Sequence, residues 1–250
     1  MFVLEYGLAF TVNRRTDSER MISGKTISVL ITTYHEKRWD NALKVVSAWL
    51  KQPVDEVWLI DGAARGLTSI KDRRFLYWPL PRDFGPQSDY GVALLTKGDL
   101  IICADDDIAP LPGFTQDLVD GMEQSGAGFV GIVGRRWTDP SYHRNKLFKA
   151  DLISKPEPVG CPGCIYMAHR MYFGFDCRDM PSRNVDDYWH CLAYKEVLKC
   201  VVPTKNYEHL PTSHDDTAMC KSRKLMNERY RFFVNMYIKH YKGAGLPGSI

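Results

Sequence analysis

The amino-acid sequence predicts an α/β protein with a mostly parallel sheet flanked by helices. Two observations carry this prediction. First, apolar segments rich in β-branched residues alternate with segments of helical periodicity between residue 26 and about residue 125. Second, several apolar segments lead directly into polar or acidic residues. In such sheets the carboxyl ends of the strands form the ligand-binding edge.

The first half of the chain is predicted to alternate buried strands with helices. Its strands are nearly continuous apolar runs, as in a sheet covered on both faces. Its helices show apolar residues at helical spacing. In chain order the elements are strand 26–34, helix 38–50, strand 55–61, strand 73–80, helix 88–98 and strand 99–104. Ser88 is the expected N-cap of the last helix, and Gly98 its end.

The second half is less regular. Two segments of mixed character are expected first, a strand with a turn over 126–137 and a strand running into a short helix over 163–175. A helix over 182–199 then carries acids in its first turn, where the helix dipole favours them. A short strand over 200–204 and an amphipathic helix from about 219 to 241 complete the chain.

The length allows one large α/β domain or two small ones, and the composition is that of an ordinary globular protein. The chain has 250 residues, of which 44% are hydrophobic, and a net charge of +3, which is too weak to argue for a nucleic-acid partner. No apolar run approaches a membrane span, and the start of the chain lacks the features of a signal peptide. Seven cysteines without a secretory signal predict reduced thiols in a cytoplasmic protein. The "CPGC" at 161–164 precedes a predicted strand, which favours structural thiols over a redox pair or a zinc site.

Three consecutive acids close the predicted strand 99–104, namely Asp105, Asp106 and Asp107. Like charges side by side repel one another unless a positive group neutralises them. Carboxylates at a strand end suit a hard divalent ion, Mg²⁺ or Mn²⁺, that can bridge a diphosphate. The alternative is that these acids cap the helix after Gly113, which would account for one Asp more easily than for three.

Four blocks of sequence resemble a known family. They are "ISVLITTY", "VWLIDGAA", "KGDLIICADDDIAPLPGF" and "NVDDYWHCLAY". In this order and spacing they are similar to the DxD-containing glycosyltransferases of the GT-A fold. The first half resembles the large family 2 of bacterial inverting enzymes, and the later blocks resemble exostosin-like transferases. The resemblance covers roughly residues 26–215. It implies a Rossmann-like mixed sheet in a single domain with a nucleotide-binding and an acceptor-binding half.

The resemblance also implies roles for residues of the donor site. Thr33 and Tyr34 would border the uridine, and Asp61 would reach the base. Asp105 and Asp106 would lie against the ribose or sugar. Gly163 would form the wall beside the transferred sugar.

The resemblance further implies a metal ion and a catalytic acid. Asp107 would ligate Mn²⁺ or Mg²⁺, with Asp105 beside it. A late histidine often completes the metal shell in this fold, and His214 is better placed for this than His209. Asp187, in the Asp186–Asp187 pair, would be the general base of an inverting enzyme or stabilise the transition state of a retaining one. For this pair the alternative is a purely structural role as first-turn helix acids.

The chain departs from the family's pattern at two places. The arginine that many members carry before the DxD helix is absent from "PQSDYG", so Arg82, or Arg73 and Arg74, are expected to supply positive charge near the nucleotide. The usual Asp-Asp-Gly-Ser after the second strand is replaced by "DGAA". This change leaves open which residue contacts the base.

These inferences predict a metal-dependent glycosyltransferase that moves a sugar from a nucleotide donor, UDP-linked by resemblance, to a hydroxyl acceptor. The expected organisation is a nucleotide-sugar half over 26–107, an acceptor half over 108–220, and a C-terminal helix and tail over 221–250. The alternatives are a metal-dependent nucleotidyltransferase acting on a sugar phosphate and a non-catalytic binding module. A glycan or a hydroxylated base in DNA could be the acceptor. The basic, aromatic tail could meet DNA, but a helix that packs its aromatic face on the core is the favoured interpretation.

Overall fold

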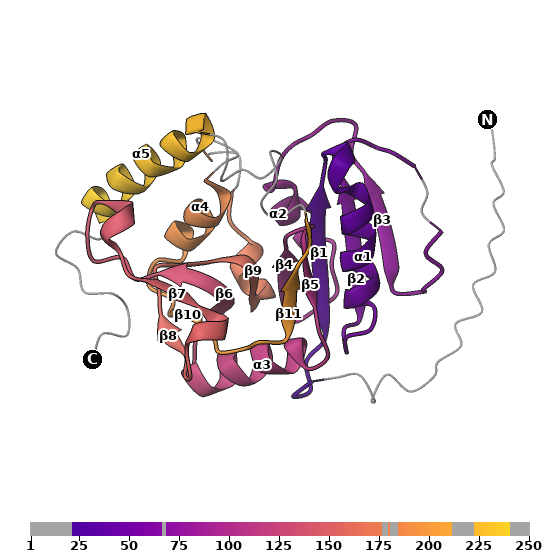
Figure 1. The fold of residues 1–250 in the computed structure, drawn as a ribbon, viewed down its shortest axis with the longest axis horizontal. Coiled ribbons are helices and arrows are strands. Elements are labelled where there is room, and N and C mark those ends of the chain that lie inside the picture. Colours follow the sequence, from indigo (N-terminus) through magenta and orange to yellow (C-terminus); the bar gives the residue numbers. More distant parts are fainter. Residues whose placement is uncertain (1–21, 67–68, 177–179, 181–184, 212–222, 241–250) are drawn as a thin grey trace, which may run out of the picture.

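The computed structural model describes residues 22–66, 69–176, 180, 185–211 and 223–240. Within them the predicted α/β architecture is confirmed, with a central sheet and helices on both faces (Figure 1). The strand order is β3-β2-β1-β4-β9-β6-β10-β8, and β7 pairs with β6. A separate two-stranded sheet joins β5 to β11.

The elements have the following bounds. The strands are β1 Ile27–Thr33, β2 Glu56–Asp61, β3 Phe75–Pro79, β4 Leu100–Ala104, β5 Ile108–Pro110, β6 Phe129–Arg135, β7 Leu147–Lys149, β8 Glu157–Pro158, β9 Cys161–His169, β10 Lys199–Val201 and β11 Tyr207–His209. The α-helices are α1 Trp39–Trp49, α2 Ser88–Ala93, α3 Phe114–Ser125, α4 Asp186–Ala193 and α5 Arg223–His240. The short 3₁₀ turns of the described residues are η2 Glu36–Arg38, η3 Tyr142–Arg144, η4 Ala150–Leu152 and η5 Arg170–Phe173.

The sheet is parallel in the first half of the chain and mixed in the second. Strand β1 pairs in parallel with β2 and β4, and β2 pairs in parallel with β3. Strand β9 runs antiparallel to both β4 and β6. The β4–β9 pairing therefore joins the two halves of the sheet, and the turn after β4 lies at this junction.

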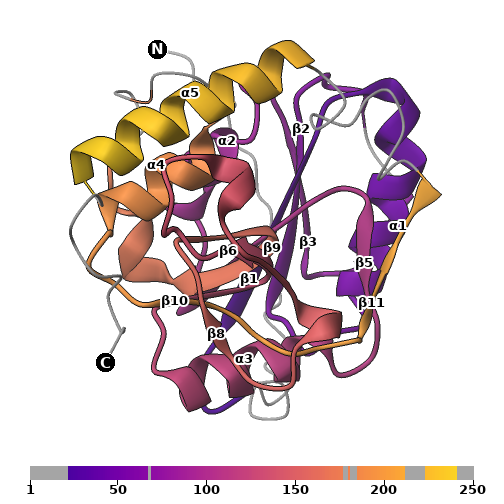
Figure 2. The ribbon, with the colours of Figure 1, turned by 60° about the vertical axis from the view of Figure 1, so that its left-hand side comes forward.

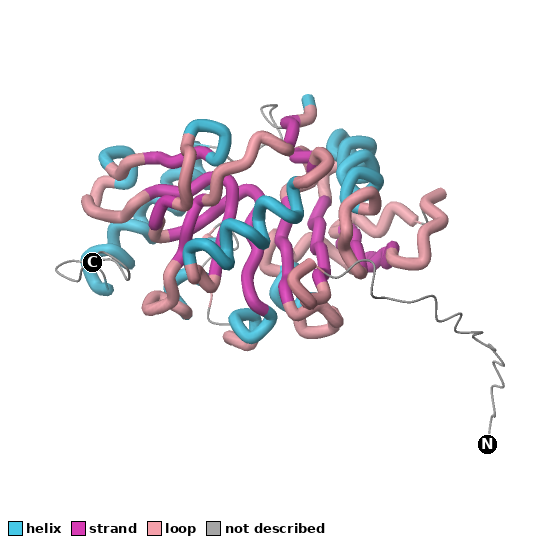
Figure 3. The backbone as a smooth tube through the Cα atoms, turned by 90° about the horizontal axis from the view of Figure 1, so that it is seen from below, coloured by secondary structure: helices cyan, strands magenta, loops and turns pink. Residues whose placement is uncertain are grey.

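The side chains of β1 point alternately to the two faces of the sheet and contribute to a hydrophobic core on each face. Val29 and Ile31 belong to the cluster under α1 and α3, whereas Leu30 belongs to the cluster under α2. Successive side chains of a strand point to opposite faces, so a continuous apolar run fills both. Figure 3 shows α3 running across the strands on its face.

The C-terminal helix packs on the protein as the favoured interpretation predicts. Phe233, Met236 and Tyr237 of α5 are buried against Trp137 and Tyr188. Figure 2 shows α5 lying alongside α4 along one edge of the molecule. Among the described helices none combines the length and the apolar character that crossing a bilayer requires.

Several elements differ from the expectation in their bounds. Helix α2 ends at Ala93 rather than Gly98, and α4 spans only Asp186–Ala193. The "CPGC" segment forms the start of β9, with Cys161 buried and Cys164 exposed as free thiols. It does not open a helix, as a redox pair would. The short strands β5, β7, β8 and β11 were not expected, because two or three residues show no periodicity.

Candidate active site

The three consecutive acids form the turn that links β4 to β5. They do not cap a helix, because α3 begins at Phe114 and its N-cap is Gly113, a glycine with a φ of 91°. The backbone N–H of Leu210 donates to the carbonyl oxygen of Asp107 at 2.8 Å, which ties the end of β11 to the turn. The capping interpretation of this cluster is therefore wrong.

A guanidinium group lies on two of the three acids. Arg38 ends the 3₁₀ turn η2 after β1, and β1 is the parallel neighbour of β4. Its Nε donates to Asp106 Oδ1 at 2.8 Å, and its Nη2 lies 2.7 Å from the same oxygen and in close contact with Asp107 Oδ2. All three residues are buried. Arg38 thus supplies part of the positive charge that the acid cluster requires.

Asp105 differs from its two neighbours. It makes no hydrogen bond or ion pair within the described part of the chain, and it is open to solvent on one side. The protein atoms around its carboxyl group nevertheless desolvate it. Desolvation, followed by the charges of Asp107 and Asp106, raises the pKa of Asp105 well above its usual range. Arg38 therefore does not neutralise the whole cluster.

The second acidic pair opens helix α4, as the sequence predicts. Asp187 receives two hydrogen bonds from Nη2 of Arg229, at 2.9 Å to Oδ1 and 2.7 Å to Oδ2. The guanidinium also lies 4.5 Å above the ring of Tyr188. Arg229 comes from α5, so the C-terminal helix fixes the position of this carboxylate.

The charge of Asp186 is less well balanced by nearby positive groups than the charge of Asp187. Its nearest partners are the Tyr90 hydroxyl, at 3.4 Å, and Nη1 of Arg229, at 4.0 Å. Burial, followed by the charge of Asp187, raises the pKa of Asp186 to about 7, while Arg229 opposes the shift. This carboxyl group can change its protonation state near neutral pH.

A chain of buried hydroxyl groups leads from Asp186 to a histidine. The hydroxyl oxygens of Tyr90 and Tyr166 lie 3.3 Å apart, and the Tyr166 hydroxyl lies 3.1 Å from His190 Nδ1. His190 Nε2 lies 2.7 Å from the carbonyl oxygen of Tyr172, which can only accept. Burial lowers the pKa of His190 to about 3, so the ring is neutral. Nε2 therefore carries the proton.

Strand β9 brings the two acidic groups to one edge of the sheet. Ala104 pairs with Ile165, so Asp105 follows at the position of Cys164 on the neighbouring strand. One residue earlier on β9, a Cβ on Gly163 would lie 3.9 Å from Asp187 Oδ2. The predicted site residues Asp105, Asp187 and Gly163 therefore lie close together at the β4–β9 junction.

The residues expected to contact the base lie at the ends of β1 and β2. Thr33 is buried and pairs with Asp61 in the sheet, and Tyr34 beyond it is exposed. Asp61 is fully buried and accepts hydrogen bonds from Arg65 Nη1 at 2.6 Å and from the Tyr77 hydroxyl at 2.8 Å. Its carboxylate therefore faces Arg65, which also donates to the carbonyl oxygen of Tyr34.

The predicted basic residues occupy different places. Arg82 is exposed, with its guanidinium 4.7 Å from the ring of Phe84. The loop that carries it lies against the end of β2, because a Cβ on Gly62 would be 3.3 Å from Asp83 Cα. Arg74 lies at the opposite end of the strands, where it donates to the carbonyl oxygen of Val54 at 3.2 Å. It is therefore not beside the other site residues.

The predicted histidine ligand, His214, lies outside the described residues. The other candidate, His209, is exposed at the end of β11. Within the described ranges no three His, Cys, Asp or Glu side chains are grouped so that they could hold a metal ion by themselves.

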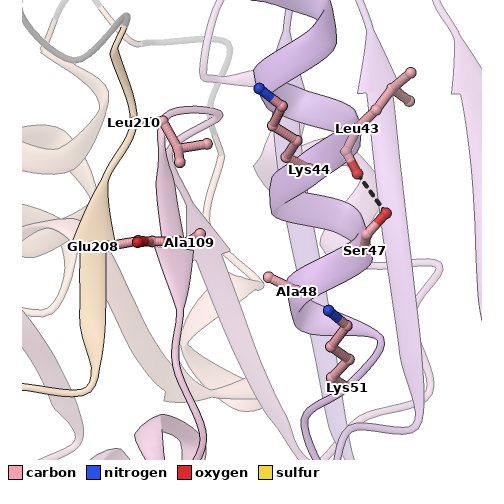
Figure 4. Close-up of a pocket in the computed structure, with 8 residues that line it drawn as sticks. All are labelled: Leu43, Lys44, Ser47, Ala48, Lys51, Ala109, Glu208 and Leu210. Atoms are coloured by element: carbon pink, nitrogen blue, oxygen red, sulfur yellow. Dashed lines mark hydrogen bonds between the residues drawn. The ribbon is translucent and has the colours of Figure 1, made fainter.

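A separate hollow of about 410 Å³ lies between α1 and the β5–β11 sheet (Figure 4). Lys44 of α1 and Lys51, just after its end, line one wall, and Glu208 lines the other. None of the predicted site residues lines it, so this hollow is distinct from the acidic edge.

Three arginines near the site were not predicted, namely Arg38, Arg65 and Arg229. Each pairs with an acid that the sequence did single out. The clustered carboxylates in the sequence did indicate that positive groups must lie nearby. Nothing in the sequence says which arginine provides the charge, since Arg229 lies 42 residues from Asp187.

Comparison with known families and structures adds independent findings. Residues 28–202 match the family model described as glycosyl transferase family 2. No curated protein matches the chain.

Two solved structures share the fold. The crystal structure of S. aureus TarS residues 1–349 aligns with a TM-score of 0.52 at 11% identity, covering 90% of this chain and 75% of that one. GalNAc-T7, solved with UDP, GalNAc and Mn²⁺, aligns with a TM-score of 0.58 at 14% identity. That alignment covers 87% of this chain and half of the GalNAc-T7 chain. Both have the mixed α/β GT-A fold that the sequence blocks predict.

Proposed function

The chain belongs to glycosyl transferase family 2 and is a glycosyltransferase, and on that premise we propose that it transfers a sugar from a UDP-linked donor with the help of a divalent metal ion. The observation that carries the proposal is the meeting of two acidic groups at the β4–β9 junction. Family membership decides against nucleotidyl transfer to a sugar phosphate.

The charge of the β4–β5 turn supports the metal ion. With all three carboxyl groups ionised, the cluster and the Arg38 guanidinium carry two net negative charges, which a divalent cation would balance. Asp107 and Asp105 are the proposed ligands, together with His214. When bound, Mn²⁺ or Mg²⁺ would supply positive charge to the departing diphosphate. The Mn²⁺ in the GalNAc-T7 crystal is consistent with this proposal.

The donor is proposed to lie along the ends of β1, β2 and β4. Thr33 and Tyr34 would border the nucleoside. Asp61 would contribute indirectly, because its carboxylate accepts a hydrogen bond from Arg65 and so positions that guanidinium group. Arg82 would supply positive charge from the loop beside β2. Asp105 and Asp106 would border the ribose and sugar. The UDP in the GalNAc-T7 crystal supports uracil as the base of the donor.

Proton transfer is assigned to the acids of α4. We propose that Asp187 faces the reacting carbon beside Gly163 and accepts the proton of the acceptor hydroxyl. Asp186 is proposed to assist as a neighbouring group that titrates near neutral pH. We propose accordingly that residues 26–107 form the nucleotide-sugar half and residues 108–220 the acceptor and catalytic half.

We propose a glycan hydroxyl as the acceptor. A DNA acceptor was considered because the C-terminal helix carries basic and aromatic residues. Three of its apolar side chains, Phe233, Met236 and Tyr237, are buried, and Arg229 is paired with Asp187. These four groups are therefore occupied within the protein and are not available to stack on bases or bind phosphates.

A donor screen tests the proposal. We expect Mn²⁺ and a UDP-sugar together to raise the thermal unfolding temperature, and the enzyme to release UDP faster when a glycan acceptor is added. Asp107→Ala should abolish both effects, because it removes the proposed ligand to the metal. Asp120→Ala, an exposed acid of α3, is the matched control and should behave as the wild type. A nucleotide effect that is independent of metal would refute the proposal.

A further inference from the structure

Arg38 is placed where a cation would bind the acid cluster. Its guanidinium lies between Asp106 and Asp107, within 2.7 Å of the former and in close contact with Oδ2 of the latter. Asp107 is the proposed metal ligand. A metal ion that uses Asp107 Oδ2 would have to share that oxygen with the guanidinium or displace it.

The charges of the site make these two cations competitors. A divalent ion beside Arg38 meets a positive group at close range in a buried environment, where charges are screened weakly. The cluster itself offers only two net negative charges after Arg38 is counted. A nucleoside diphosphate brings further negative charge and phosphate oxygens, which favour Mg²⁺ and Mn²⁺. The diphosphate therefore offsets the repulsion that the metal alone would meet.

We propose that Arg38 is a built-in counter-ion of the Asp105–Asp107 cluster that keeps a divalent metal ion weakly bound until a nucleoside diphosphate arrives with it. The inference rests on the proposed metal-dependent function and adds the reason why metal and donor bind together. It makes Arg38 a positioning residue, which acts on the reaction through Asp106 and Asp107.

A second arginine shows what a purely structural pair looks like. Arg74 pairs with Asp72 at 2.9 Å and donates to the carbonyl oxygens of Gln52 and Val54. It is as buried as Arg38, with side-chain exposures of 12% and 11%. It contacts a single acid at the far end of the strands, whereas Arg38 spans two acids of a cluster of three. Arg74 is therefore a matched control.

The test measures Mn²⁺ binding to the full chain, with and without UDP, from the electron paramagnetic resonance signal of free Mn²⁺. The central comparison is Asp106→Asn against the double variant Arg38→Met/Asp106→Asn. The double variant removes one charge of each sign, so it keeps the net charge of the wild type and differs from Asp106→Asn only in the charge of Arg38. Arg38→Gln, which retains hydrogen-bond donors but no charge, is a second variant. Arg74→Met/Asp72→Asn is the control.

In the wild type we expect weak Mn²⁺ binding that UDP tightens by about tenfold or more. The double variant should bind Mn²⁺ alone about tenfold tighter than Asp106→Asn, and UDP should then add less. Arg38→Gln should also bind Mn²⁺ alone more tightly than the wild type. The Arg74 control should match the wild type.

Two outcomes would overturn the inference, and they are distinguishable. If UDP tightens Mn²⁺ binding in every form but removing Arg38 leaves binding of Mn²⁺ alone unchanged, Arg38 is structural and the proposed function stands. If no form binds Mn²⁺ with or without UDP, the metal-dependent function fails and the role of Arg38 fails with it.

Discussion

At the scale of single residues, Asp89 of α2 is a buried carboxyl group with one neutral partner. The Thr32 hydroxyl donates to Asp89 Oδ1, and among the described residues no basic side chain forms an ion pair with this carboxyl group. Burial raises the pKa of Asp89 to about 7, and the hydrogen bond from Thr32 opposes the shift only in part. Ionised Asp89 therefore destabilises the folded state.

The sign of the pH dependence follows from this shift. In the unfolded chain Asp89 titrates near pH 4, so between about pH 4 and pH 7 the folded protein holds a proton that the unfolded chain has lost. The contribution of Asp89 to stability falls across that window and is constant above it. We expect Asp89→Asn to raise the free energy of unfolding at pH 8 by about 2–4 kcal/mol and to leave it unchanged at pH 4.

Urea unfolding at both pH values checks this prediction. Asp120→Asn, on the exposed side of α3, should change neither value. An equal gain for Asp89→Asn at pH 4 and pH 8 would show that the benefit comes from packing and not from removal of a charge.

The acids of the site could be identified from sequence, but their partners could not. Carboxylates directly after an apolar strand stand out in the sequence, because a need for polar surface residues does not account for three acids at the end of a buried strand. Arg38 lies 68 residues from Asp106. The sequence alone does not distinguish it, as a partner of Asp106, from the other basic residues in that interval. The pairing follows from the parallel arrangement of β1 and β4, which places the loops after them side by side.

At the scale of elements, the turn between α2 and β4 depends on a glycine. A Cβ on Gly98 would lie 2.5 Å from both the backbone nitrogen and the Oγ of Ser28 on β1. The N–H of Gly98 donates to the same Ser28 Oγ at 2.8 Å, so the two strands enter the sheet in close contact. This turn sets the start of β4 and hence the position of the acids at its end.

We expect Gly98→Ala to lower the free energy of unfolding by about 1–3 kcal/mol, because backbone must move to admit the methyl group. Gly91→Ala, in the middle of α2, should instead raise it by about 0.5–1 kcal/mol, since nothing lies within 4 Å of the new atom and alanine favours the helix. Chemical unfolding of the two variants gives both values. Similar effects of the same sign would contradict the close approach at Gly98.

Strand direction was the least predictable property of the elements. The apolar run from Ile165 to Ala168 indicates a buried strand, and β9 is one. Its antiparallel pairing with β4 and β6 is determined by the chain path through β5, α3 and β6, which periodicity does not encode. The same path places Gly163 beside Asp187.

At the scale of the whole molecule, the two halves of the sheet contribute different parts of the site. The residues proposed for the nucleotide and the metal follow β1, β2 and β4, whereas β9 carries Gly163, proposed for the transferred sugar, and α4 carries the acids proposed for proton transfer. The acids among these residues were named from the sequence because they follow apolar strands or open a helix. The C-terminal helix was predicted only as a packing helix, since the contact of Arg229 with Asp187 depends on how α5 crosses α4 (Figure 2).

On the proposed role of Asp187 as the base, its contact with Arg229 makes Arg229 of α5 a positioning residue. Arg229 holds Asp187 with two hydrogen bonds from one nitrogen, which fixes the direction of the carboxylate beside Gly163. We expect Arg229→Met to lower kcat by about 10- to 100-fold, because a misdirected base loses alignment with the acceptor hydroxyl. Binding of UDP with Mn²⁺ should be unchanged, because the proposed ligands Asp105 and Asp107 follow β4 and make no contact with Arg229 that the structure shows.

Steady-state kinetics and a UDP–Mn²⁺ binding titration separate these two effects. Arg231→Met, an exposed position two residues further along α5, is the control and should keep the wild-type kcat. Arg229→Lys should restore part of the activity, since an ammonium group keeps the charge but not the planar donor geometry. If Arg229→Met weakened UDP–Mn²⁺ binding as much as it lowered kcat, α5 would support the whole fold and not the acceptor half alone.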